Sequence, residues 1–120
     1  MKKSAKAPAH LIPRAVVAEL GVAMLEGSIK YGAHNWRDGK TAASTLYDAA
    51  QRHIESWWMG ESTDPDSGLP HLVKAMANLT ILRDSETRGC LLDDRQREND
   101  PYPNLDIIVK NLTGDCKDEN

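Results

Sequence analysis

Proline and glycine divide most of the sequence into three segments with the periodicity of an α-helix. Apolar residues recur at every third or fourth position within each segment. Pro13 and Pro70 stand where a helix would begin, and Gly32 and Gly60 stand where one would end, which is the usual placement of these residues. We therefore predict three helices joined by two short loops. The three segments cover residues 13–31, 44–59 and 70–83.

The remaining local signals favour an all-α fold. Ser44 offers a side-chain oxygen to cap the second helix. The sequence has no stretch of alternating apolar and polar residues long enough for a strand, which argues against an α/β nucleotide-binding fold. It also lacks both glycine-rich phosphate-binding motifs. We expect a helical bundle in which any phosphate is held by a metal ion and basic side chains.

The bulk composition indicates one domain that needs a partner copy. The chain has 120 residues, of which 40% are hydrophobic and only 5% aromatic, so it buries a modest core. We expect a homo-oligomer, either a dimer or a tetramer. We assign residues 1–10 to a flexible N-terminus, 11–84 to the helical core and 85–120 to a polar C-terminal extension with a partly irregular, disordered end. Within the extension, residues 105–112 are apolar enough to pack on a partner as a short helix or strand.

Charge and hydropathy exclude several partners. The net charge is −3, and the basic residues near the N-terminus form no amphipathic face, so duplex nucleic acid is not an expected partner. No apolar stretch reaches the length of a membrane helix or a signal peptide, so we expect no membrane contact and a cytoplasmic location. Cys90 and Cys116 match no metal or disulfide spacing, and we expect free thiols.

Ionisable side chains are densest around the second loop and the two helix ends that flank it. Carboxylates on facing helices can hold Mg²⁺ or Mn²⁺ against a triphosphate, and such an ion lowers the pKa of an attacking water. The alternative is a solvated acidic turn without a ligand. The cluster comprises Arg52, His53, Glu55, Glu61, Asp64, Asp66 and His71.

Three members of the helical segments have two interpretations each. His53 falls on the apolar stripe of the second helix, as either a core histidine with one hydrogen bond or a metal ligand. Arg52 suits a phosphate, or it pairs with Asp48 or Glu55 on the same helix. Asn78 shares a polar face with His71 on the third helix, where its amide contacts either a ligand or the backbone.

The first loop carries groups typical of a base-binding pocket. Lys30, Tyr31, Asn35 and Trp36 supply a cation, two rings and an amide within seven residues. Such groups stack on a purine and bind its edge. Trp36 has the alternative role of filling the end of the bundle.

Together these motifs resemble a known family. The string Lys30-Tyr-Gly-x-x-Asn-Trp36, then Arg52-His53, then Gly60-Glu61-x-x-Asp64-x-x-Ser67-Gly68-x-x-His71 and Asn78 is similar to the phage-type dATP/dGTP diphosphohydrolases. It also resembles the MazZ group, the MazG-like enzymes of phages that replace adenine with 2-aminoadenine. The resemblance covers residues 11–83.

The resemblance implies an oligomeric MazG-like helical bundle that uses Mg²⁺ or Mn²⁺. It implies hydrolysis of dGTP or dATP to the monophosphate and pyrophosphate, and in such a phage dGMP feeds synthesis of the diaminopurine nucleotide. MazG-like enzymes hold metal on an ExxE pair and an ExxD pair, whose positions are occupied here by Arg52 to Glu55 and by His71 to Lys74. Of these four end positions, only Glu55 keeps a carboxylate.

A metal set and catalytic roles follow from this resemblance. Because Lys74 cannot bind a metal while protonated, we expect the acidic loop to supply the missing ligands. Arg52 or Lys30 would offset charge on the phosphates, while Glu55 or Glu61 orients or deprotonates the water. The expected metal ligands are Glu55, Glu61, Asp64 and His71, together with His53.

Two alternative functions place different requirements on the sequence. A helical HD-type triphosphohydrolase needs a His-Asp doublet, and no histidine of this chain precedes an aspartate. A non-catalytic helical nucleotide-binding or adaptor oligomer is the main alternative, and Lys74 at a ligand position supports it.

Overall fold

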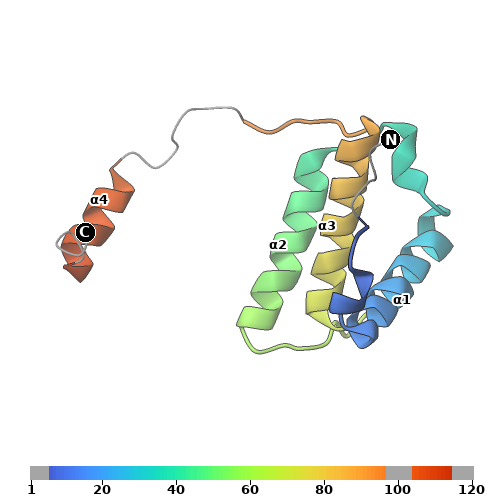
Figure 1. Cartoon of the computed structure of the whole chain (residues 1–120), viewed down its shortest axis with the longest axis horizontal. Coiled ribbons are helices and arrows are strands. Elements are labelled where there is room, and N and C mark those ends of the chain that lie inside the picture. The colour runs from blue at the N-terminus through green and yellow to red at the C-terminus, as the bar shows by residue number, and fades with distance from the viewer. Residues whose placement is uncertain (1–5, 97–103, 115–120) are drawn as a thin grey trace.

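Helix α3 (His71–Arg88) lies at the centre of a three-helix bundle. It packs against α2 (Ala43–Trp58), α1 (Arg14–Tyr31) and the short 3-10 helix η2 (Asn35–Asp38) (Figure 1). The computed structural model describes residues 6–96 and 104–114. These residues form no strand, and their only β-type pairs are two isolated bridges. The predicted all-α fold is confirmed.

Proline and glycine bound the helices as the sequence indicates. Pro13 and Pro70 precede the first residues of α1 and α3. Gly32 follows α1 with φ at 95°, and Gly60 follows the end of α2 with φ at 105°. Residues with a side chain rarely adopt these angles, so glycine lets the chain leave each helix sharply.

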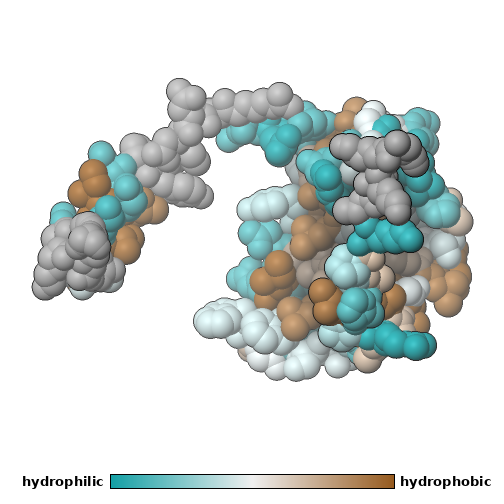
Figure 2. Space-filling view, viewed as in Figure 1, coloured by the Kyte–Doolittle hydropathy of each residue, from teal (hydrophilic) through white to brown (hydrophobic). Residues whose placement is uncertain are grey.

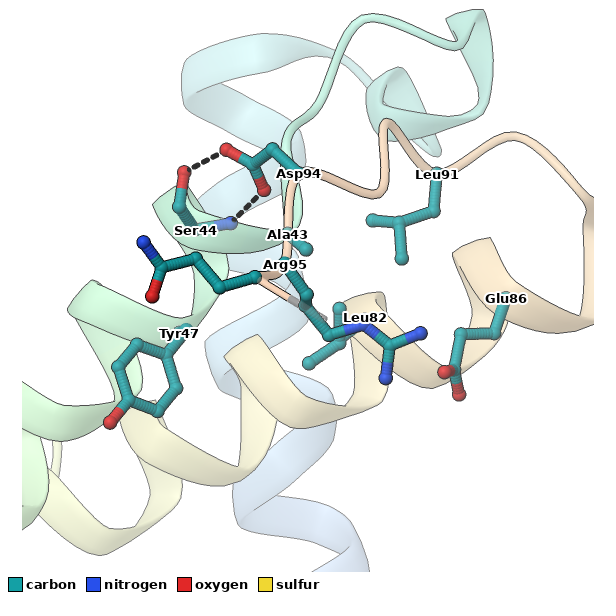
Figure 3. A pocket seen from close by; sticks show the side chains of 9 residues that line it. Ala43, Ser44, Tyr47, Leu82, Glu86, Leu91, Asp94 and Arg95 are labelled. Carbon is teal, nitrogen blue, oxygen red and sulfur yellow. Dashed lines mark hydrogen bonds between the residues drawn. The ribbon is translucent and has the colours of Figure 1, made fainter. Parts of the chain in front are cut away.

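The predicted cap of α2 is wrong. Ala42, not Ser44, is the N-cap, and Ser44 lies within the first turn. Its backbone N–H donates to Asp94 Oδ1 over 2.9 Å and its hydroxyl donates to Asp94 Oδ2 (Figure 3). These bonds hold the pKa of the Asp94 carboxyl below its usual value. A carboxylate from a distant segment therefore caps the helix, which periodicity within residues 44–59 cannot reveal.

The chain after α3 returns to the start of α2. Leu92 N–H donates to the Thr41 carbonyl over 3.0 Å, and Ala43 N–H donates to the Leu92 carbonyl over 2.9 Å. Helix α3 itself continues past residue 84 to Arg88. Residues 85–92 are thus joined to the bundle by helix and backbone hydrogen bonds, and Asp94 is joined to it by its side chain.

The core is small, as the composition predicts. Alanine makes up most of it, and many large apolar side chains stay exposed, among them Ile29, Trp58 and Met59. Brown apolar patches are visible on the bundle face in Figure 2. The buried apolar residues are Ala23, Trp36, Ala43, Leu46, Ala50, Val73 and Ala75.

The C-terminal extension contributes one further helix. Helix α4 (Leu105–Thr113) is drawn apart from the bundle, and all its residues are exposed (Figure 1). Near the N-terminus, Ala9–Leu11 form a 3-10 turn, η1, which begins inside the stretch expected to be flexible and ends one residue beyond it. Cys90 is an unpaired, half-buried thiol, whereas Cys116 and the rest of 115–120 lie outside the described residues. None of the described helices is both long and apolar enough to cross a bilayer.

Candidate active site

The loop between α2 and α3 folds back on itself and carries Asp64 to the start of α3. Asp64 N–H donates to the Leu69 carbonyl over 2.8 Å, and Gly68 N–H donates to the Asp64 carbonyl over 2.7 Å. His71 N–H donates to the Ser62 carbonyl over 2.9 Å, which fastens the loop to the first turn of α3. The predicted acidic turn is therefore ordered by its own backbone around Asp64.

Two histidines and a glutamate form a chain of side-chain hydrogen bonds beside this loop. The Nδ1 atoms of His53 and His71 lie 2.9 Å apart, and Nε2 of His71 lies 2.7 Å from Oε1 of Glu61. His71 is only 4% exposed, whereas Glu61 is exposed at the rim. Helix α2, the loop and α3 each contribute one of the three groups.

The hydrogen-bond chain sets the tautomer of His71. A carboxylate only accepts, so Nε2 of His71 carries the proton that Glu61 receives. In the neutral ring, Nδ1 of His71 then keeps its lone pair and points it at His53. Burial, and then the neighbouring His71, hold the pKa of His53 below its ordinary value. His53 thus favours the neutral form, in which a ring nitrogen can bind a metal.

Asp64 completes a group of three possible metal ligands. One ligand atom from each of His53, Asp64 and His71 lies within 4.8 Å of the other two. Asp64 Oδ1 also accepts a 3.0 Å hydrogen bond from the Asp66 backbone N–H. That bond is the main cause that keeps the pKa of Asp64 low, so the carboxylate stays charged.

This donor set fits Mn²⁺ better than Mg²⁺. Two imidazoles and one carboxylate suit a transition metal, whereas Mg²⁺ prefers oxygen ligands. The two Nδ1 atoms, 2.9 Å apart, are close enough for one ion to bind both. The carboxylate of Glu61 on the far nitrogen of His71 matches the way protein metal sites orient a histidine ligand.

A lysine lies at the edge of the candidate metal site. Lys74 Nζ is 2.6 Å from Glu26 Oε1 on α1 and 3.9 Å from Asp64 Oδ2. Lys30 also pairs with Glu26, at 3.4 Å. The hydrogen bond from Lys74 is the largest cause that lowers the pKa of Glu26. Two lysines and two carboxylates therefore form one ion-pair network across α1, the loop and α3.

A cleft runs beside the site, between α1, η2 and α2, over one face of α3. It comprises two adjoining hollows of about 220 Å³ and 600 Å³. Lys30, His53 and Lys74 line the smaller hollow, and Asp48 and Arg52 line the larger one. The residues shared by both hollows are Tyr31, Asn35, Trp36, Ala49, Asn78 and Ile81.

The structure brings all the predicted base-binding residues to this cleft, but two of them also have structural roles. Trp36 is 8% exposed, and its Nε1–H donates to Asp84 Oδ2 over 2.8 Å. Asn78 Nδ2 donates to the Lys74 carbonyl over 3.0 Å. Trp36 therefore fills the bundle end and Asn78 bonds the backbone, while each also lines the cleft.

Arg52 and Glu55 line a shallow groove that is separate from the two hollows of the cleft. Arg52 lines both the cleft and this groove, whereas Glu55 and Glu61 line only the groove. Within residues 6–96 and 104–114, the Arg52 side chain has no ion pair with Asp48 or Glu55. The structure thus leaves Arg52 available to an anion and places Glu55 outside the group of three ligands.

Sequence reasoning missed two acidic residues of this region. Glu26 carries no distinguishing pattern, because its spacing from Lys30 on α1 is typical of an ordinary surface ion pair. Asp84 holds both Trp36 and Arg37, through hydrogen bonds of 2.8 and 2.9 Å. Neither residue carries a local signal, since each acts on residues more than forty positions away.

Comparison with known proteins places the chain in a family. No curated protein and no solved structure matched it. The model of a family described as "dATP/dGTP diphosphohydrolase, N-terminal" matches residues 1–95, a span that includes the bundle, the loop and the Asp94 cap. With most of its length matched, the chain belongs to the dATP/dGTP diphosphohydrolase family.

Proposed function

We propose that this protein hydrolyses a purine deoxynucleoside triphosphate, dGTP or dATP, to the monophosphate and pyrophosphate. The family is named for these two nucleotides. The observation that carries the proposal is the meeting of His53, Asp64 and His71 beside a cleft that is lined by cationic and aromatic side chains and by His53 itself. We propose Mn²⁺ or Mg²⁺ as the cofactor, with those three residues as ligands.

The cleft gives each part of the substrate a place. The purine lies in the part shared by both hollows, against Tyr31 and Asn35. The triphosphate extends toward the smaller hollow, where Lys30 and His53 lie, and Arg52 lines the adjoining larger hollow. Arg52 has the fork geometry that binds phosphate oxygens in pairs, and it has no carboxylate partner on its own helix.

The reaction breaks the bond between the α-phosphorus and the oxygen that bridges it to the β-phosphorus. A water oxygen forms the new bond to the α-phosphorus, pyrophosphate leaves, and the water gives up a proton. A bound divalent ion supplies charge neutralisation and makes the water more acidic. Arg52 and Lys30 stabilise the negative charge that develops on the phosphate oxygens.

Glu61 has two tasks in this proposal. Its Oε1 accepts the Nε2 proton of His71 and so aims the other ring nitrogen at the metal position. Its Oε2 has no hydrogen-bond partner among the residues described. We therefore propose that Oε2 accepts the proton that the water releases. Glu55, which lies outside the group of ligands, becomes a comparison residue in the tests below.

Two wider expectations belong to the same proposal. The small alanine-rich core and the exposed apolar side chains support a homo-oligomer. The motifs shared with the MazZ group support a role in remodelling a phage nucleotide pool, within the host cytoplasm. The non-catalytic nucleotide-binding oligomer remains the alternative, because Lys74 occupies a position where related enzymes carry a ligand.

One experiment tests the reaction class. The purified protein is incubated with each of the four deoxynucleoside triphosphates, with Mn²⁺, Mg²⁺ or EDTA, and the products are separated by anion exchange. We expect dGMP or dAMP together with pyrophosphate, and no product with EDTA. Release of intact triphosphate would indicate the other hydrolase class. If no nucleotide is consumed with either metal, the protein is a binding module.

The same assay tests the metal ligands. His53→Ala and His71→Ala should each abolish turnover. Replacement of His10, an exposed histidine outside the ligand group that lines neither hollow of the cleft, should leave it unchanged. Equal activity in all the variants would contradict the assigned site.

A further inference from the structure

Lys74 lies between two carboxylates that come from different elements. Its ammonium is 2.6 Å from Glu26 on α1 and 3.9 Å from Asp64 on the loop, and the Lys74 side chain is only 16% exposed. Both carboxylates are also largely shielded, with side chains 24% and 14% exposed. The ammonium is therefore a fixed internal charge and not a mobile surface group.

This arrangement has the form of a bridged metal site with an ammonium at its centre. Carboxylates from separate elements that converge on one cation are the usual ligands of a divalent ion. Asp64 belongs both to this bridge and to the group with His53 and His71. Asp64 thus belongs to two cation positions. One lies among His53, Asp64 and His71, and the other lies between Glu26 and Asp64, where the Lys74 ammonium is found.

We propose that Lys74 takes the place of a second metal ion, so that the chain binds a divalent cation only at His53, Asp64 and His71. The proposal rests on the proposed function, because it assumes the metal site described there. In this proposal Lys74 determines how many metal ions the site accepts.

Two physical effects support this exclusion. A divalent ion joining Glu26 to Asp64 must approach each oxygen to about 2.0–2.2 Å, and the ammonium already occupies the space between them. The positive charge of Lys74 also repels such an ion across a partly buried site, where screening by water is weak. Without Lys74, two shielded carboxylates would lose their counter-charge, and binding a metal would restore it.

The closing experiment counts bound Mn²⁺. The purified full-length chain is titrated with Mn²⁺ alone, and bound metal is obtained from the electron paramagnetic resonance signal of the free ion. Spectra at low temperature then report whether two bound ions lie close enough to couple. The variants are Lys74→Gln, Lys74→Met, Lys74→Arg, and Lys74→Gln combined with Glu26→Gln.

We expect wild type and Lys74→Arg to bind one Mn²⁺ per chain. Lys74→Gln and Lys74→Met should bind a second ion and show a coupled pair, and the added Glu26→Gln should remove the second ion again. The Arg variant is the matched control, because it keeps the charge. Far-ultraviolet circular dichroism identifies any variant that has unfolded. Because both Lys74→Gln and Lys74→Met remove the charge, one of them can still be tested if the other does not fold.

Other outcomes separate this inference from the metal site on which it rests. If Lys74→Gln and Lys74→Met both fold and bind the same number of ions as wild type, Lys74 does not exclude a metal. Two ions in wild type would overturn the inference equally. If wild type binds none and Lys74→Gln binds one that depends on Glu26, the role of Lys74 stands while the site at His53, Asp64 and His71 is wrong.

Discussion

Oε1 of Glu61 lies 2.7 Å from Nε2 of His71, a residue that is only 4% exposed. An exposed carboxylate thus fixes the orientation of a buried imidazole, and it does so on the side of the ring turned away from His53. In the proposed mechanism Glu61 therefore makes two separate contributions. Oε1 orients the metal ligand His71, and Oε2 accepts the proton that the water releases.

Replacement of Glu61 should show both contributions. Glu61→Ala removes the partner of His71, so we expect Mn²⁺ affinity to fall about 10- to 100-fold. Glu61→Gln keeps an oxygen for the His71 proton and should retain more of the affinity, while turnover falls about 10²- to 10⁴-fold because the proton acceptor is lost. Calorimetric titration gives the affinity and the pyrophosphate assay gives kcat.

Glu55→Gln is the comparison for both measurements. Since Glu55 lies outside the ligand group, its replacement should leave Mn²⁺ affinity unchanged. An equal loss of affinity in Glu55→Gln would mean that Glu55 is a ligand, as the ExxE pair of related enzymes implies.

Arg52→Ala should weaken transition-state stabilisation, because Arg52 faces the cleft without a carboxylate partner on α2. Loss of one charged hydrogen-bond donor corresponds to a decrease in kcat/KM of about 10- to 100-fold. Arg83→Ala is the control, since Arg83 is an exposed arginine of α3 paired with Glu86. A similar loss in Arg83→Ala would point to a general effect of net charge.

Gly27 on α1 lines the smaller hollow, and a Cβ built there meets no atom within 4 Å. Gly27→Ala should therefore stabilise the protein by about 0.5–1 kcal/mol, because alanine is a better helix former. Gly27→Leu should raise KM by filling the hollow. Thermal unfolding and nucleotide kinetics check the two expectations.

Gly21 provides the matched pair for Gly27, since it lies on α1 with open space around it and away from the cleft. Gly21→Leu should leave KM unchanged. If both leucine variants raise KM equally, the hollow at Gly27 is not part of the substrate site.

Asp84 should make stability depend on pH at the acidic end. Hydrogen bonds from Arg37 and then Trp36 hold the pKa of this carboxyl well below its usual value of 3.8. A lowered folded-state pKa means that the contribution is present above the unfolded pKa and is lost as pH falls below it. Asp84→Asn should lower the melting temperature at pH 7 and flatten its decrease below pH 4.

The test compares melting curves of wild type and Asp84→Asn between pH 2.5 and 7. Curves that stay parallel over the whole range would show that Asp84 does not contribute in the charged form. Asp38→Asn is a suitable control, because Asp38 is an exposed aspartate of η2.

Helix positions were predictable because the signals for them are local. The predicted first helix, 13–31, differs by one residue from the observed Arg14–Tyr31, and Pro70 precedes α3 as expected. Periodicity and the conformations allowed to proline and glycine are properties of neighbouring residues, so one sequence suffices to read them.

The candidate site was predictable in part, because its members cluster around one loop. His53, Glu61, Asp64 and His71 span fewer than twenty positions, and the structure brings them together. The distinction between Glu55 and Glu61 depends on the direction in which α2 turns Glu55, which the spacing alone left undecided. The link between Lys74 and Glu26 joins residues 48 positions apart, and nothing local signals it.

The contact of Asp94 with Ser44 has a consequence for the order in which the protein is assembled during translation. The two residues are 50 positions apart, so the ribosome has released the whole of α2, the loop and α3 before the carboxylate that caps α2 emerges. The first turn of α2 keeps unpaired N–H groups until then. Chains in which Asp94 has not yet left the ribosome should consequently expose this helix end to proteases, and chains in which it has left should protect it.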